Sequence, residues 1–216
     1  MTAVDRIQKR SFDLVFSLGG LFLLWPVILI SWPLARLSTG ASGIFKQQRI
    51  GRHGTTFTVY KLRTMAASDA ASTTVTIHGD VRVTRFGAFL RRTKIDELPQ
   101  LWNVARGDMS IVGPRPDVAG FADNLEGEVR RVLELRPGIT GPATIKYSQE
   151  EKLLAECGNP ERYNSEVIYP DKTRLNLEYY DTWSLREDIR LICMTIHLLP
   201  RSDNLRLPVL RDNPVD

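Results

Sequence analysis

Cysteine and histidine are scarce in this chain, which has two cysteines and three histidines in 216 residues. Cys157 and Cys193 form no C-x-x-C pair, and their spacing from the histidines matches no zinc-binding pattern. The sequence therefore argues against a disulfide framework and a zinc site, and it is compatible with a reducing compartment. The hydrophobic fraction of 43% and the charged fraction of 25% are typical of a folded globular protein.

Several common functional signatures are also missing. The chain has no Walker A loop, no G-x-G-x-x-G and no G-x-S-x-G, so the familiar phosphate-cradling and acyl-transfer motifs are absent. It has no basic stretch interleaved with aromatic residues, which argues against nucleic acid as a partner. The net charge of +4 leaves anionic lipids and phosphate-bearing substrates as candidate partners.

One long apolar run is present, between Asp13 and Arg36. Residues 14–35 carry no charge, and as a straight helix they would extend roughly 33 Å, enough to cross a bilayer core. A secretory signal is one alternative, but the run exceeds the usual apolar region and no small-residue cleavage site follows it. The other alternative is a buried helix of a soluble core. We favour membrane association over both.

The membrane topology depends on Pro26, near the middle of this run. Pro26 removes one helical hydrogen bond and its ring clashes with the carbonyl of Phe22, which favours a kink. Basic residues flank both ends of the run, and positive charge marks the cytoplasmic side. These basic residues are Arg6, Lys9 and Arg10 before the run, and Arg36, Lys46, Arg49, Arg52, Lys61 and Arg63 after it. The residues alone are compatible with both a spanning and a re-entrant helix, and either topology leaves the remaining chain in the cytoplasm.

The rest of the chain predicts a mainly helical α+β fold. We divide it into an anchor helix (1–37), a catalytic domain (38–200) and a poorly ordered tail (201–216). Residues 56–63 alternate as a strand after a turn at 52–54, with Lys61 and Arg63 on one face. Residues 66–79 are small and polar, and we expect a loop there. The predicted helices lie at 84–92, 99–105, 117–135, from Ser148 to Cys157, from Pro170 onward, and at 184–199.

The last of these helices begins with a capping box, Ser184 with Glu187, as does the one at Ser148 with Glu151. Its apolar positions recur with helical spacing at residues 185, 189, 192, 196 and 199. Such a face either packs into the core or lies on the membrane surface as an amphipathic interface helix.

Adjacent acids, Asp96 and Glu97, precede Pro99, which is expected to open a helix. The positive end of that helix, with Arg91, Arg92 and Lys94 nearby, would favour ionised carboxylates. An ionised carboxylate can attack phosphorus as a nucleophile or ligate Mg²⁺. The alternative is structural: Asp96 caps the helix and Glu97 supports its dipole.

Arg115 lies between two prolines, Pro114 and Pro116, which restrict the backbone on either side of it. An arginine presented with little freedom suits bidentate binding of phosphate oxygens. It could equally be an exposed arginine in a polyproline-like turn. In the same way, Lys61 and Arg63 are either a second phosphate clamp or a solvated strand face.

Ordered blocks of sequence carry a resemblance to a known family over nearly the whole chain. These blocks are KRSFD (9–13), FKQQRIGRHG (45–54), YKLRTM (60–65), the stretch from DVRVTRFGAFLRRTKIDELPQ to SIVGPRP (80–116), RPGITGPA (136–143) and EYYDTWSLREDI (178–189). The chain resembles the monotopic phosphoglycosyl transferases, also called the bacterial sugar transferase family. The resemblance favours the functional interpretations of Asp96, Glu97 and Arg115.

The resemblance implies a re-entrant helix at the cytoplasmic face of the bacterial inner membrane, broken at Pro26. Asp96 would attack the β-phosphate of a UDP-sugar, UMP would leave, and polyprenyl (undecaprenyl) phosphate would accept the phosphosugar from the aspartate. Glu97 would be associated with Mg²⁺. The expected substrate-binding residues are Lys61, Arg63, Arg91 and Arg115. Such enzymes initiate assembly of capsule, O-antigen, exopolysaccharide or glycoprotein glycans, and a homodimer is left open.

Three positions depart from the family pattern. Trp25 replaces the serine that usually precedes Pro26, Lys94-Ile95 replaces Ser-Leu before the acids, and residues 145–151 (IKYSQEE) differ from the common pattern. Because residues 145–151 can bear on which sugar is used, the resemblance is not extended to the identity of the donor sugar. Two other functions stay open: a non-enzymatic membrane-anchored binding protein, and a nucleotide-sugar hydrolase that uses water as acceptor.

Overall fold

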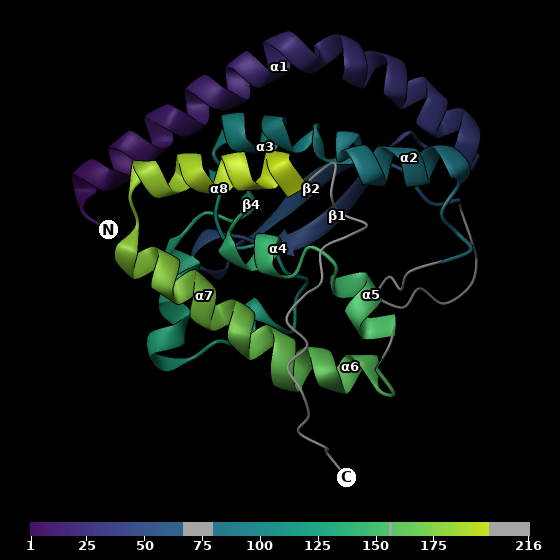
Figure 1. The fold of residues 1–216 in the computed structure, drawn as a ribbon. Coiled ribbons are helices and arrows are strands. Elements are labelled where there is room, and N and C mark those ends of the chain that lie inside the picture. The colour runs from purple at the N-terminus through teal and green to yellow at the C-terminus, as the bar shows by residue number, and fades with distance from the viewer. Residues whose placement is uncertain (67–79, 156, 199–216) are drawn as a thin grey trace.

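A long apolar helix, α1 (Ala3–Thr39), arches over the rest of the molecule in the computed structural model, which describes residues 1–66, 80–155 and 157–198 (Figure 1). The helix begins with a capping box, in which Thr2 Oγ1 accepts from the Asp5 N–H at 3.2 Å. It ends at Gly40, whose φ of 67° is left-handed. The helix extends beyond the predicted apolar run at both ends and bends near its middle, with Pro26 and Pro33 inside it.

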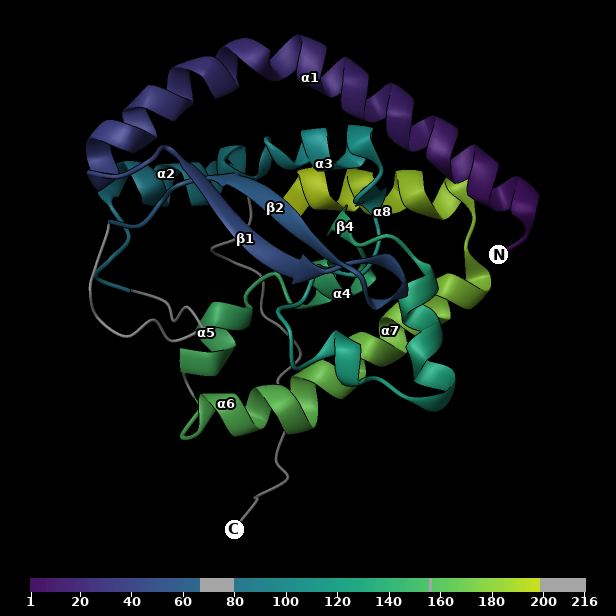
Figure 2. The ribbon, with the colours of Figure 1, turned by 180° about the vertical axis from the view of Figure 1, so that it is seen from behind.

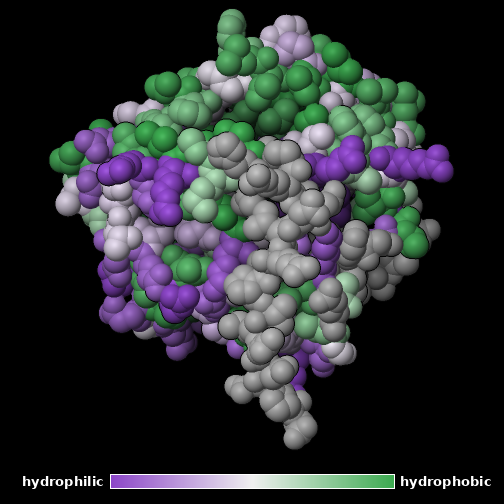
Figure 3. All heavy atoms as spheres, viewed as in Figure 1, coloured by the Kyte–Doolittle hydropathy of each residue, from purple (hydrophilic) through white to green (hydrophobic). Residues whose placement is uncertain are grey.

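The outer surface of α1 is apolar and exposed. Its most apolar 18-residue window has a mean hydropathy of 2.3, and only 11% of that window is buried. Phe22 and Leu23 are among the exposed side chains, and hydrophobic residues cover the top of the molecule where α1 lies (Figure 3). The alternative of a buried helix in a soluble core is therefore wrong, and α1 is long and apolar enough to cross a membrane.

Two short sheets lie below the arch. Strands β1 (Ile44–Ile50) and β2 (Thr56–Leu62) form an antiparallel hairpin closed by the turn η1 (Arg52–Gly54), which confirms the predicted turn and strand (Figure 2). Strands β3 (Ser110–Val112) and β4 (Gly138–Thr140) pair in parallel. The main core contains the buried side chains of Val59, Leu101, Val104, Met109, Val112, Tyr179 and Leu191.

Two helices carry the segment between the strands, as predicted. Helix α2 (Arg85–Thr93) is capped by Thr84, whose Oγ1 accepts from the Gly87 N–H at 2.9 Å. Helix α3 (Gln100–Arg106) begins one residue after Pro99, so Pro99 lies at the cap rather than at the first helical position. The short 3₁₀ turn η2 (Ile95–Glu97) joins them after Lys94.

The predicted helix at 117–135 is wrong. The structure instead has two 3₁₀ segments, η3 (Ala122–Asn124) and η4 (Gly127–Glu134). Gly120 and Gly127 have φ values of 98° and 60°, which lie in the left-handed region and interrupt a right-handed helix. These two glycines therefore divide the segment into short 3₁₀ turns instead of one helix.

The C-terminal third is helical. It comprises α4 (Pro142–Lys146), α5 (Glu150–Ala155), α6 (Pro160–Tyr163), the π turn η5 (Asn164–Ile168), α7 (Tyr169–Thr182) and α8 (Leu185–Leu198). Pro170 lies in the first turn of α7, as predicted, although α6, η5 and α7 run on without a break from Pro160. The π turn directly before Pro170 shifts the hydrogen-bond pattern, which accommodates a proline inside the helical run.

Helix α8 begins as predicted, with the Glu187 N–H donating to Ser184 Oγ at 3.2 Å. Only part of its apolar pattern packs inward. Of the predicted positions, Ile192 packs against the core, whereas Ile189 and Ile196 are 48% and 59% exposed, and the buried Leu191 lies outside the predicted pattern. The helix thus packs into the core on one side and presents apolar side chains on another. The tail at 201–216 and, apart from Ala66, the predicted loop at 66–79 lie outside the described residues.

Candidate active site

The adjacent acids lie in η2, between the ends of α2 and α3. Lys94, with a left-handed φ of 57°, ends α2 and turns the chain into η2. Asp96 is 8% exposed, so η2 holds it inside the molecule rather than at the surface. The predicted position of the acids, immediately before a helix, is confirmed.

Glu97 forms the centre of an ionic cluster. Its Oε1 accepts from Lys61 Nζ at 2.9 Å and lies 3.5 Å from Arg115 Nη2. Burial alone would raise the pKa of Glu97, but the charges of Lys61, Arg115 and Lys94 hold this pKa below its ordinary value. Residues separated by up to 54 positions therefore meet at one ionised carboxylate, which orients the two cations.

Asp96 has a different environment. Its Oδ1 is buried and has no hydrogen-bond partner among the residues that the structure describes. Burial, and then the negative charge of Glu97, raise the pKa of Asp96 to about 6, against the opposing charges of Lys61, Lys94 and Arg91. The nearby cations favour the ionised form of Asp96, as predicted, but burial outweighs them and the pKa lies above its ordinary value. At pH 7 the carboxylate is still roughly nine-tenths ionised.

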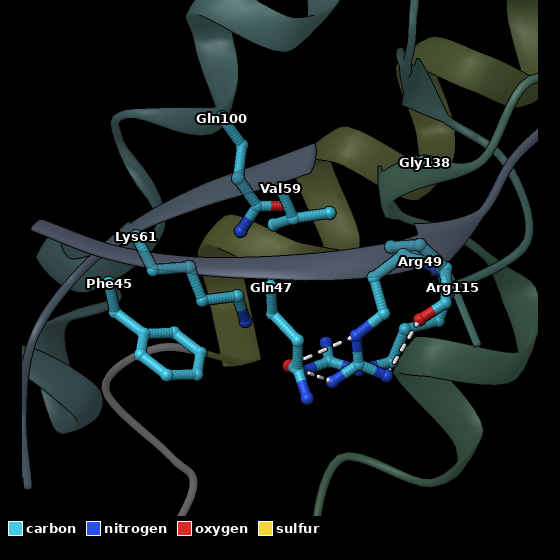
Figure 4. A pocket seen from close by; sticks show the side chains of 9 residues that line it. Phe45, Gln47, Arg49, Val59, Lys61, Gln100, Arg115 and Gly138 are labelled. Atoms are coloured by element: carbon cyan, nitrogen blue, oxygen red, sulfur yellow. Dashed lines mark hydrogen bonds between the residues drawn. The ribbon is translucent and has the colours of Figure 1, made fainter. Parts of the chain in front are cut away.

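A pocket opens beside this cluster, on one face of the β1–β2 hairpin (Figure 4). It is lined by Phe45, Gln47, Arg49, Val59, Lys61, Gln100, Arg115, Pro116 and Gly138. Antiparallel pairing of Phe45 with Lys61 and of Gln47 with Val59 places these side chains on the same face. The hairpin register thus assembles most of the pocket wall.

Arg49 is a pocket residue that the sequence analysis missed. Its Nη2 and Nε donate to Gln47 Oε1 at 2.6 and 3.1 Å, and its Nη1 donates to the Pro116 carbonyl at 3.2 Å. The signal that could have found it is the alternation of Phe45, Gln47 and Arg49 along a strand. We had counted Arg49 only as a basic flank of the apolar run.

Arg63 and Arg91 do not line the pocket. Arg63 Nε donates to the Ser42 carbonyl at 2.8 Å, and its guanidinium lies 5.5 Å from the centre of the Phe45 ring. Arg91 Nε donates to Thr64 Oγ1 at 3.0 Å. The structure therefore brings together Asp96, Glu97, Lys61 and Arg115, while Arg63 and Arg91 lie at the periphery; the charge of Arg91 still acts on Asp96.

The loop that carries Arg115 is held by β4. The Gly113 N–H donates to the Thr140 carbonyl at 2.8 Å, and the Gly138 N–H donates to the Pro114 carbonyl at 2.7 Å. A Cβ on Gly113 would lie 2.3 Å from the Arg136 carbonyl oxygen, so only glycine fits this close approach. These contacts add to the two prolines in presenting Arg115 with little freedom.

We expect Arg115→Lys to weaken binding of a UDP-sugar at least about tenfold, although the charge is kept. A planar guanidinium can donate two parallel hydrogen bonds to phosphate oxygens, which an ammonium cannot, and a charge-assisted bond is worth roughly 1.5–3 kcal/mol. Titration calorimetry measures the effect. Equal affinity of wild type and variant would show that Arg115 acts only as a point charge or not at all.

The residues can hold Mg²⁺ only together with a substrate. Among the residues described, no group of three or more His, Cys, Asp or Glu side chains could hold a metal. Mg²⁺, however, commonly binds one or two carboxylates and takes its other ligands from water and substrate phosphates. The carboxylate of Glu97, beside Lys61 and Arg115, supplies a hard oxygen ligand of this kind. The site therefore fits a magnesium ion shared with phosphates.

Comparisons with known proteins agree with this site and fold. The family described as bacterial sugar transferase matches residues 4–201, so the chain belongs to that family and is a sugar-phosphate transferase. The chain is 34% identical to the uncharacterized sugar transferase EpsL of Bacillus subtilis (strain 168), over 93% of this chain and 91% of EpsL.

Two further relatives are similar at the same level. The exopolysaccharide production protein ExoY of Sinorhizobium fredii is 34% identical, with 89% of this chain and 85% of that protein covered. A UDP-glucose:undecaprenyl-phosphate glucose-1-phosphate transferase of Caulobacter vibrioides is also 34% identical, with 94% and 73% covered. The resemblance found in the motifs is therefore confirmed along almost the whole chain.

Proposed function

We propose that this enzyme transfers a sugar 1-phosphate from a UDP-sugar to undecaprenyl phosphate at the cytoplasmic face of the bacterial inner membrane, which starts assembly of a surface polysaccharide. The observation that carries the proposal is the buried Asp96 Oδ1, which has no partner among the described residues, beside the Glu97–Lys61–Arg115 cluster. Relatives named for UDP-glucose, undecaprenyl phosphate and exopolysaccharide production support the substrate classes. The donor sugar is left open.

In the proposed reaction, Asp96 Oδ1 attacks the β-phosphorus of the UDP-sugar. A bond forms from the aspartate oxygen to phosphorus, the bond from phosphorus to the bridging oxygen breaks, and UMP leaves with that oxygen. An oxygen of undecaprenyl phosphate then attacks the same phosphorus and releases Asp96. Mg²⁺, when bound, would neutralise charge on the phosphates.

Lys61 and Arg115 face the transferring phosphoryl group in this mechanism. Phosphoryl transfer depends mostly on positioning and on stabilising charge at the phosphate oxygens, which two oriented cations can provide. Glu97 keeps these cations in place and stays ionised while Asp96 reacts. The two adjacent acids thus have different tasks because their surroundings move their pKa values in opposite directions.

The test is to mix the enzyme with Mg²⁺ and a panel of UDP-sugars without lipid acceptor. With the right donor we expect the mass of one phosphosugar to appear on Asp96, and a UMP burst no larger than the enzyme concentration. Steady UMP release without acceptor would instead show a hydrolase. A protein that binds these nucleotides but releases no UMP, with or without undecaprenyl phosphate, would be a binding protein.

The pH dependence of this burst follows from the raised pKa of Asp96. Only the carboxylate can attack phosphorus, so protonation near pH 6 should halve the burst rate, and each further pH unit below should lower it about tenfold. Because the acceptor is left out, titration of its phosphate does not contribute. A burst rate that is unchanged from pH 7 to pH 5 would contradict Asp96 as a nucleophile with this pKa.

The contacts of α1 support a re-entrant topology. Near its N-terminus, Arg10 Nη1 and Nη2 donate to the carbonyls of Val104 and Ala105 at 2.6 and 2.8 Å. Near its C-terminus, the fully buried Ala35 packs with Leu62 and Leu90. A straight helix of 37 residues would be about 55 Å long, so its ends could not both reach one domain on the same side of a bilayer. A bent helix that enters and returns satisfies both contacts.

Cysteine labelling tests this topology. In a Cys157→Ser/Cys193→Ser background, Thr2→Cys and Ser42→Cys should both react with a membrane-impermeant reagent from the cytoplasmic side only. Moving the basic flank across the membrane would oppose both the positive-inside bias and a potential of about 2.3 kcal/mol per charge per 100 mV. Adding Pro26→Leu restores a helical hydrogen bond and removes a clash, an effect of roughly 3 kcal/mol, so part of the Thr2→Cys population should become periplasmic. Periplasmic labelling of Thr2→Cys with Pro26 in place would show a spanning helix.

A further inference from the structure

Gln100, the first residue of α3, has a buried amide that none of the described residues satisfies. The residue is 2% exposed, and its Nε2 has no hydrogen-bond partner within the described part of the chain. Its side chain lines the pocket and points from α3 toward Val59 (Figure 4). A buried amide without an acceptor costs free energy, so such a group is expected to have a partner in a functional state of the protein.

The pocket cannot supply that partner from its own polar side chains. Gln47 Oε1 already accepts from Arg49, and Glu97 Oε1 accepts from Lys61 beside Arg115. The cations Arg49, Lys61 and Arg115 and the Gln100 amide therefore line the pocket with hydrogen-bond donors. A ligand that fits this wall carries negative charge and several acceptor oxygens, as phosphate groups do.

The position of Gln100 relative to the acids strengthens this argument. Gln100 follows Asp96 by four residues, across the η2–α3 junction, which is one helical turn. Asp96 Oδ1 and Gln100 Nε2 are both buried, and neither has a hydrogen-bond partner in the part of the chain that the structure describes. One is an acceptor suited to attack phosphorus, and the other is a donor suited to hold an oxygen on the same phosphate.

We propose that the Gln100 side-chain amide donates hydrogen bonds to phosphate oxygens of the nucleotide diphosphate, as a neutral binding residue beside Lys61 and Arg115. This inference rests on the proposed function for the identity of the nucleotide. The undecaprenyl phosphate acceptor has the same phosphate chemistry, so the experiment has to separate the two sources.

The test compares Gln100→Met with Gln48→Met as a matched control. Methionine has a similar length and no hydrogen-bonding amide, and Gln48 is an exposed β1 residue whose Nε2 donates to Thr58 Oγ1 outside the pocket. Calorimetry with UDP as the probe should show about tenfold weaker binding for Gln100→Met, since a hydrogen bond to a charged acceptor is lost. Gln100→Glu should bind UDP more weakly still, because a carboxylate repels phosphate. Gln48→Met should bind it as wild type does.

Steady-state kinetics then show whether Gln100 binds the phosphates of the nucleotide or the phosphate of the lipid acceptor. For Gln100→Met we expect the KM for the UDP-sugar to rise about tenfold, with the KM for undecaprenyl phosphate and the pH profile of the burst unchanged. Unaltered UDP affinity, or a rise only in the KM for the lipid, would overturn the assignment to the nucleotide. A shifted pH profile would overturn it too, because it would show that Gln100 instead orients Asp96. Loss of UDP affinity in a protein that transfers no sugar with any donor would leave the Gln100 assignment standing and refute the proposed function.

Discussion

Asp96→Asn is expected to lower sugar-phosphate transfer at least about a thousandfold while leaving the protein as stable as wild type or more stable. A neutral amide cannot form the bond to phosphorus that the two-step reaction requires. The phosphosugar adduct should disappear together with the UMP burst. Asp181→Asn, which changes an exposed acid paired with Arg131, is a suitable control and should keep full activity.

The stability half of this prediction follows from the raised pKa of Asp96. Burial raises the pKa from 3.8 to about 6, so ionised Asp96 opposes folding at pH 7 by up to about 3 kcal/mol. This penalty is fully present above pH 6, shrinks as the pH falls toward 4 and disappears below the unfolded-state pKa of 3.8, where the residue is protonated in the folded and unfolded states alike. The Tm of Asp96→Asn minus that of wild type should therefore be largest at pH 7 and much smaller at pH 4.

Glu97→Gln should lower the stability of the protein, in contrast to Asp96→Asn. The pKa of Glu97 is held low, so its ionised form stabilises the fold, and the amide would leave Lys61 and Arg115 without a counter-charge. We expect lower Tm and lower activity together. If Asp96→Asn kept a tenth of wild-type activity, Asp96 would be a structural residue and the proposed mechanism would be wrong.

How much of the site could be predicted depended on whether a residue lies in a short, unusual motif. Arg115 lies between two prolines, Asp96 and Glu97 are adjacent acids just before a helix, and Lys61 lies on an alternating strand, so their chemistry was visible in the sequence. Arg49 and Gln100 were missed because each is an ordinary strand or helix residue in its local sequence. Their place in the pocket comes from the hairpin register and from packing of α3, which no local pattern encodes.

The fold shows the same division. Helices with a capping residue and a regular apolar pattern, such as those at 84–92 and 184–199, were predicted closely. The helix at 117–135 failed because Gly120 and Gly127 take left-handed conformations that the apolar pattern does not reveal. Pro170 lies in the first turn of α7 as predicted, but the sequence did not reveal that a π turn joins α7 to α6 in one continuous helical run. On α8, the buried face carries Asp188 and Leu191, so Ile189 and Ile196 lie on another, exposed face of the helix.

The second large effect that we expect is a loss of stability when the contact of Asp188 with the N-terminal end of α1 is broken. Its Oδ2 accepts from Lys9 Nζ at 2.7 Å and from Trp183 Nε1 at 3.2 Å, and its Oδ1 accepts from the Tyr179 hydroxyl. Asp188 is completely buried and the Lys9 side chain is 8% exposed. We expect Lys9→Met to destabilise the protein by about 3–5 kcal/mol, because it leaves a buried carboxylate without its counter-charge. For a chain of this size that corresponds to a fall in Tm of about 10 °C.

The double variant Lys9→Met/Asp188→Leu decides whether the cost comes from the missing partner or from lost packing. Replacing both charges removes the uncompensated carboxylate, so at least half of the lost stability should return, although Tyr179 and Trp183 lose an acceptor. The exposed pair of Arg162 and Glu166 gives the matched comparison, and Arg162→Met should change the free energy of unfolding by less than about 0.5 kcal/mol. If Lys9→Met were equally mild, or if the double variant were as unstable as Lys9→Met, the buried pair would not be what fastens the N-terminal end of α1. The bend of α1 would then have to be maintained by its other contacts, among them those of Arg10 and Asp13 and the packing of Ala35.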